Sequence, residues 1–144
     1  MDWLKYTIDY GIIGLLILMS FVAVAIGIER YLLFKKLKVE EFRDRKSLEL
    51  ELTSKLHLIA SIGSNAPYIG LLGTVLGIML TFHTMGTQGF MDTGQIMIGL
   101  ALALKVTAVG LMVAIPAITI YNLLLRKVKV MLMEWEILDG RERV

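Results

Sequence analysis

The chain has 144 residues, of which 56% are hydrophobic and 19% charged, with a formal net charge of +2. The apolar share exceeds the roughly 45–50% of soluble domains and predicts one membrane domain covering residues 1–144. No motif or charge excess indicates nucleic-acid binding. Cysteine is absent, which excludes disulfides and thiolate chemistry. The two histidines have no acidic ligand at helical spacing, so we expect no metal. The sequence has no nucleophile–base set and no phosphate loop, so we expect no enzyme activity and no cofactor.

Three runs lack Asp, Glu, Lys and Arg: Tyr10–Ile28, Leu56–Met91 and Val106–Leu125. About 20 helical residues cross the roughly 30 Å hydrocarbon layer. Backbone groups in lipid must pair within their own segment, which favours helices over strands. The sequence therefore predicts an all-α integral membrane protein with three transmembrane helices, at about 10–28, 62–84 and 98–125. We expect the first to be retained, because its flank is not basic and the apolar run is longer than that of a signal peptide.

The basic residues of the connections predict the orientation. Eight Lys or Arg lie in residues 30–58 and five from Arg126 onward, whereas residues 83–95 contain none and Lys5 stands alone before the first span. The positive-inside rule places the N-terminus outside, in the periplasm, and the C-terminus in the cytoplasm. Residues 30–58 are predicted to be cytoplasmic helical extensions of spans one and two, joined by a turn near Asp44–Ser47. Residues 83–95 are expected to be a short polar link.

Small residues recur at steps of three and four in spans two and three, which places them on one face of each helix. Stripes of this kind allow helices to pack closely in lipid. Three helices of this length are too few to cover both stripes, so we expect a homo-oligomer or a partner helix. The stripes are Gly63, Pro67, Gly70, Thr74, Gly77 and Thr81 in span two, and Gly99, Ala103, Thr107, Gly110, Ala114, Ala117 and Tyr121 in span three.

Thr74 and Thr107 lie near the middle of the two stripes. One interpretation is that each hydroxyl binds a carbonyl of its own helix. The other is that both line a narrow proton path. No Asp or Glu lies in the middle of any span, so a carboxylate on such a path has to come from another subunit.

Three further charges are candidates for interfacial roles. Glu29 and Arg30 follow the first apolar run directly. Lys105 precedes the third run, and we expect its side chain to extend toward the outer surface. The alternative for Lys105 is an ion pair with a carboxylate elsewhere.

Two segments resemble the signatures of the MotA/TolQ/ExbB proton channel family. The first is residues 66–79, followed by Thr81-Phe82, and the second is residues 107–117, followed by Tyr121-Asn122. Glu29-Arg30 after the first span also fits. The chain departs from the family pattern at Leu102, where members often carry Glu.

The resemblance implies a ring, a pentamer, in the bacterial inner membrane, surrounded by lipids. Its central pore would hold single-span ExbD-like partners that carry a proton-binding aspartate. Thr74 and Thr107 would face that aspartate, and proton flow would energise a TonB-like protein for outer-membrane import. A TolQ-like role in envelope integrity and a passive membrane scaffold for partner helices are the alternatives.

Overall fold

The computed structural model describes residues 2–89 and 92–143. Every regular element in this part of the chain is helical, as predicted. The elements are α1 (Asp2–Lys36), a 3-10 turn η1 (Val39–Glu41), α2 (Arg45–Thr53), α3 (Leu56–Gln88) and α4 (Thr93–Arg143).

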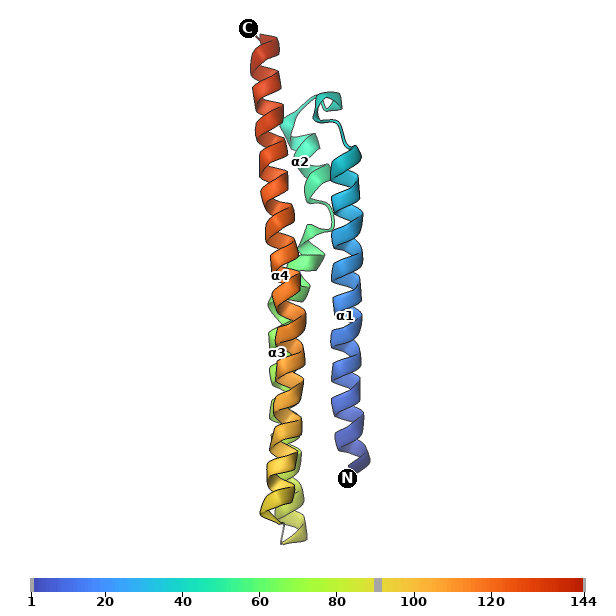
Figure 1. Cartoon of the computed structure of the whole chain (residues 1–144), viewed down its shortest axis with the longest axis vertical. Helices are drawn as coiled ribbons and strands as arrows, with labels where there is room; N and C mark the ends of the chain where they lie inside the picture. Colours follow the sequence, from blue (N-terminus) through green and yellow to red (C-terminus); the bar gives the residue numbers. More distant parts are fainter. Residues whose placement is uncertain (1, 90–91, 144) are drawn as a thin grey trace.

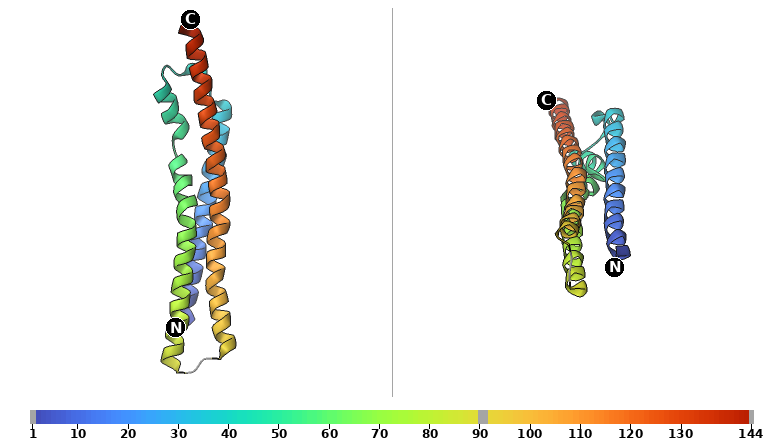
Figure 2. Two further views of the ribbon diagram at one scale, coloured as in Figure 1. Left: turned by 90° about the vertical axis from the view of Figure 1, so that its left-hand side faces the viewer. Right: turned by 60° about the horizontal axis from the view of Figure 1, so that its bottom comes forward.

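Helices α1, α3 and α4 run lengthwise beside one another and form an elongated bundle (Figures 1 and 2). All three are long and apolar enough to cross a membrane, so the structure has three candidate spans, the number that the sequence predicts. The N-terminus and the α3–α4 connection lie at one end of the bundle, and α2 and the C-terminus lie toward the other (Figure 1). We call the second the α2 end.

The helices extend further than the predicted spans. Only residues 89–92 separate α3 from α4, so most of the link expected at residues 83–95 is helical. Gly89 ends α3 with φ of 72°, and its N–H donates to the carbonyl of Met85 at 3.1 Å. This left-handed ending favours glycine, which has no Cβ to clash. Phe90 and Met91, also part of the expected link, lie outside the described residues.

The connection between spans one and two differs from the predicted helical hairpin. A turn occurs near Asp44, as expected, and the Asp44 carboxylate accepts a hydrogen bond of 2.8 Å from the Ser47 N–H at the start of α2. The second extension, however, is interrupted at Ser54 and Lys55. Lys55 has φ of 69°, a conformation that side chains with a Cβ rarely adopt, so α2 and α3 are separate helices.

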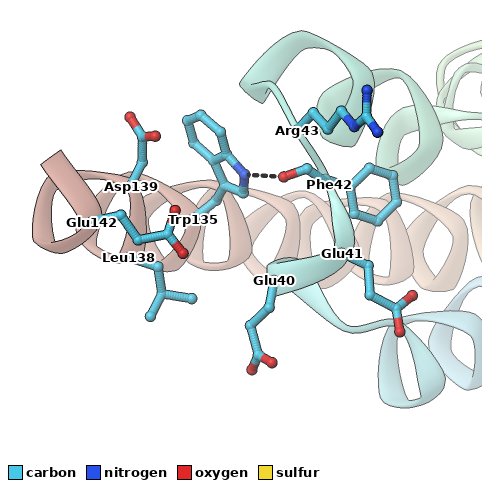
Figure 3. A pocket seen from close by; sticks show the side chains of 8 residues that line it. All are labelled: Glu40, Glu41, Phe42, Arg43, Trp135, Leu138, Asp139 and Glu142. Atoms are coloured by element: carbon cyan, nitrogen blue, oxygen red, sulfur yellow. Dashed lines mark hydrogen bonds between the residues drawn. The ribbon is translucent and has the colours of Figure 1, made fainter.

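Apolar packing at the α2 end holds the short elements in place. Leu48 and Leu52 of α2 and Val39 of η1 are buried in one cluster with Leu124 and Leu132 of α4. The Trp135 Nε1–H donates to the Phe42 carbonyl at 2.9 Å and closes this cluster (Figure 3). A second cluster, nearer the middle of the bundle, joins the three long helices. Its members are Leu16, Ala66, Val113 and Ala114.

Candidate functional site

The two stripes of small residues face each other along the contact between α3 and α4. A Cβ at Gly70 would lie 3.0 Å from the Val106 carbonyl oxygen, and one at Gly110 would lie 2.7 Å from the Ala66 carbonyl oxygen. The backbones of the two helices therefore touch, and only glycine fits at both positions. The premise that three helices cannot cover both stripes is wrong, because each stripe covers the other.

The same contact continues toward the N-terminal end of the bundle. A Cβ at Gly77 would lie 2.9 Å from the Ala103 Cβ, and one at Gly99 would lie 2.8 Å from the Thr81 Oγ1. Toward the α2 end, Ala114 is buried in the second cluster, which joins α4 to α1 and α3. The helix-packing residues expected from sequence thus lie within one chain's own interface, and any oligomer has to use other surfaces.

Thr74 and Thr107 meet at the centre of this interface. The two hydroxyl oxygens are in hydrogen-bond contact with each other. The Thr74 hydroxyl also lies 2.8 Å from the Ala103 carbonyl of α4 and 3.3 Å from the Gly70 carbonyl of its own helix. The Thr107 hydroxyl lies 3.3 Å from the same Gly70 carbonyl. Thr74 thus reaches a carbonyl of its own helix, as the first interpretation expects, whereas Thr107 contacts α3. The interpretation that both line a proton path stays a prediction.

The two hydroxyls differ in accessibility. Thr74 is 6% exposed, whereas Thr107 is half-buried. Each hydroxyl has one proton to donate and can accept hydrogen bonds as well. If Thr74 donates to Ala103, its nearest carbonyl, then Thr107 donates to Thr74 and keeps lone pairs for another group. Thr107 is therefore the member of the pair that a second molecule can reach.

Glu29 and Arg30 lie beside the break between α2 and α3. The Arg30 Nη1–H donates at 2.9 Å to the carbonyl of Glu51 in the last turn of α2. Glu29 accepts a hydrogen bond of 2.9 Å from Lys55, the residue in the left-handed conformation. Arg30 is only 6% exposed. A buried guanidinium near a helix C-terminus satisfies a carbonyl and complements the helix dipole. The pair thus fixes the α2–α3 junction to α1.

Lys105 is exposed on α4, and among residues 2–89 and 92–143 it forms no salt bridge. Asp9 lies near the start of α1, four residues after Lys5. The Asp9 Oδ1 atom is buried and has no hydrogen-bond partner in the described structure. Sequence reasoning did not select Asp9, although its position directly before the first apolar run and four residues after Lys5 was visible. The polar residues at this end of the bundle therefore include a carboxylate as well as lysines.

The fold and site define a multi-pass membrane protein in which α3 and α4 share a partly buried hydroxyl pair and contain no carboxylate in the middle of a span. The chain matches the model of the MotA/TolQ/ExbB proton channel family over residues 26–137 and belongs to that family. Members of this family are channel and transport proteins of the bacterial inner membrane.

Similarity to individual proteins extends over nearly the whole chain. The chain is 57% identical over 140 residues to the biopolymer transport protein ExbB of Aquifex aeolicus, covering 97% of this chain and 95% of that protein. It is 57% identical over 134 residues to the putative biopolymer transport protein ExbB-like 2 of Helicobacter pylori strain 26695, covering 93% and 89%. A match to the Tol-Pal system protein TolQ of Pseudomonas aeruginosa is shorter, with 43% identity over 74 residues, covering 51% and 32%. The chain is thus similar to short ExbB proteins.

Proposed function

We propose that the chain is an ExbB-like proton-channel subunit that works with an ExbD-like single-span partner and uses the proton motive force to energise TonB-dependent import. The observation that carries this proposal is the Thr74–Thr107 pair in a channel-family chain whose spans contain no central carboxylate. Similarity to ExbB proteins along almost all of both chains supports it. The carboxylate that binds and releases protons belongs to the partner.

In this proposal Thr107 serves the partner carboxylate in both protonation states. A protonated carboxyl donates to the Thr107 oxygen while Thr107 donates to Thr74, and Thr74 donates to the Ala103 carbonyl. An ionised carboxylate instead accepts from Thr107, and Thr74 keeps its bond to Ala103. A hydroxyl can play both parts because it is donor and acceptor at once. The partner's carboxyl group therefore keeps a hydrogen bond to Thr107 whether it is protonated or ionised.

The proposed assembly is a pentamer in which the α3 and α4 helices surround the partner spans. The proposed orientation has the N-terminus in the periplasm and the α2 end in the cytoplasm. It follows from the basic residues, which are concentrated in residues 30–58 and after Arg126. The arrangement of the helices supports it, because these two basic segments lie toward the same end of the bundle (Figure 1).

A TolQ-like role in envelope integrity is the second candidate, favoured by the 43% identity with TolQ over 74 residues. Two experiments test these proposals, the first the assembly with a partner and the second the choice between the two roles. Native mass spectrometry of the chain co-expressed with a single-span, aspartate-bearing partner is expected to give a five-to-two complex, and an assembly that excludes the partner would contradict the proposal.

Deletion of the chain's gene is the second experiment. It is expected to abolish uptake of a TonB-dependent substrate and to leave detergent resistance intact. Loss of detergent resistance with normal uptake would support the TolQ-like role instead. If both properties survive deletion although the wild-type chain does form the complex with its partner, a passive scaffold is the better description.

A further inference from the structure

An apolar furrow lies on the surface of the bundle where α1 and α4 meet. It runs from the middle of the bundle toward the α2 end. Its part nearer the α2 end has a volume of about 240 Å³ and lies between α1 and α4. It is lined by Val24, Gly27, Ile28 and, at its mouth, Tyr31 of α1, and by Ile120, Leu123 and Leu124 of α4. A second hollow of about 370 Å³, lined by Ile17, Phe21 and Met112 among others, continues it toward the centre. Val24 lines both hollows, so they form one furrow.

The furrow is longer than the hydrocarbon depth of one lipid leaflet. From Ile17 to Tyr31, α1 rises by about 21 Å at 1.5 Å per residue. One leaflet contributes about half of the roughly 30 Å hydrocarbon layer. An extended acyl chain that enters at Tyr31 can therefore lie in the furrow until it reaches the middle of the membrane.

Two cations converge at the mouth of this furrow. The Lys35 Nζ atom of α1 lies 4.6 Å from the centroid of the Tyr31 ring, and the Lys127 Nζ atom of α4 lies 4.9 Å from it. Within residues 2–89 and 92–143, neither lysine forms a salt bridge. Two ammonium groups at one ring repel each other, and an anion between them removes that repulsion. The mouth is therefore complementary to a negatively charged group.

We propose that the furrow binds one anionic phospholipid, with an acyl chain between α1 and α4 and the headgroup phosphate at Lys35 and Lys127. Basic sites between transmembrane helices at the cytoplasmic surface favour anionic lipid headgroups. An acyl chain gains little from apolar contact alone, because the bilayer offers the same contact. Selectivity for phosphatidylglycerol over phosphatidylcholine thus comes from the two lysines. This proposal rests on the proposed orientation, which places the mouth in the inner leaflet, and is independent of proton conduction.

The test is native mass spectrometry of the full chain with its partner, released from nanodiscs of equal phosphatidylglycerol and phosphatidylcholine. We expect about tenfold preferential retention of phosphatidylglycerol, and we expect the double variant Lys35→Gln/Lys127→Gln to abolish the preference. The matched control is Lys36→Gln/Lys129→Gln, which removes the same charge from neighbouring exposed positions and is expected to keep it. Leu123→Trp, at a 66% exposed position, is expected to reduce retention of either lipid by filling the furrow.

Equal loss of the preference in both double variants would overturn the proposal, because general surface charge would then explain it. Wild-type protein that retains no lipid would overturn it as well. So would a cross-link from position 123 to a second copy of the chain at full yield, because the furrow would then be a subunit contact.

Discussion

Replacement of Gly110 by alanine tests whether the contact between α3 and α4 is as close as described. The new Cβ would lie 2.7 Å from the Ala66 carbonyl oxygen and 3.0 Å from the Gly70 Cα. Both obstacles are backbone atoms, so no side-chain rotation relieves the clash and the helices have to separate. Thr107 lies one turn from Gly110 on the same face of α4, so the separation also weakens the hydroxyl pair.

The magnitude follows from two opposing terms. Overpacking a tight contact costs about 1–3 kcal/mol, and rigid backbone obstacles place this site toward the upper end. Alanine regains up to about 1 kcal/mol over glycine in helix propensity. The expected net loss for Gly110→Ala is therefore about 1–2 kcal/mol. Gly14→Ala on α1 is the matched control, because nothing lies within 4 Å of a Cβ there.

The assay is unfolding of the purified protein in mild detergent, followed by circular dichroism as SDS is added. We expect Gly110→Ala to unfold at lower SDS than wild type, and Gly14→Ala to unfold at the same concentration or a higher one. Equal stability of the two variants would refute the close contact, because a Cβ cannot fit between touching backbones without cost.

Two further predictions concern the α2 end. Arg30→Ala leaves the Glu51 carbonyl without its donor and is expected to destabilise the α2–α3 junction by about 1.5–3 kcal/mol, measured as faster hydrogen exchange of α2 amides. Arg45→Ala, which removes exposed ion pairs, is the control and is expected to have a smaller effect. The hydrogen bond from Ser47 holds the pKa of Asp44 below its ordinary value. The stabilisation of α2 by the ionised Asp44 carboxylate is therefore complete above the ordinary pKa and is lost as the pH falls through the lowered pKa. We therefore expect hydrogen exchange of the α2 amides to increase at low pH in the wild type. Asp44→Asn, which keeps a capping oxygen but does not titrate, is expected to remove this increase. An unchanged pH profile in the variant would show that Asp44 is not the group responsible.

The spans could be predicted from sequence because a membrane imposes a length and an apolar composition that are visible in one chain. The stripes were visible as periodicity, but periodicity gives the face of a helix and not its partner. Gly70 and Gly110 therefore indicated close packing without showing that they touch each other. That pairing depends on how α3 and α4 are rotated about their axes, which is a property of the folded bundle.

Other features had weak or misleading local signals. Lys55 adopts a left-handed conformation that sequence patterns associate with glycine, and the α2–α3 break was therefore missed. Gly86 and its polar neighbours suggested a loop, yet helix α3 continues to Gln88. The Thr74–Thr107 contact joins residues 33 positions apart. Their central positions in two stripes suggested a shared role, but only the bundle brings their hydroxyls together.

The most direct test of the proposed mechanism is proton flux into liposomes that contain the chain together with its single-span partner. Flux is expected to require both proteins. Thr107→Val is expected to reduce it about tenfold to a hundredfold, because the partner carboxylate, a charged group, loses one hydrogen bond. Thr119→Val, which removes an exposed hydroxyl bonded within α4, is the control and is expected to conduct like wild type. Undiminished flux through a fully assembled Thr107→Val complex, or equal flux from the chain alone, would contradict the account.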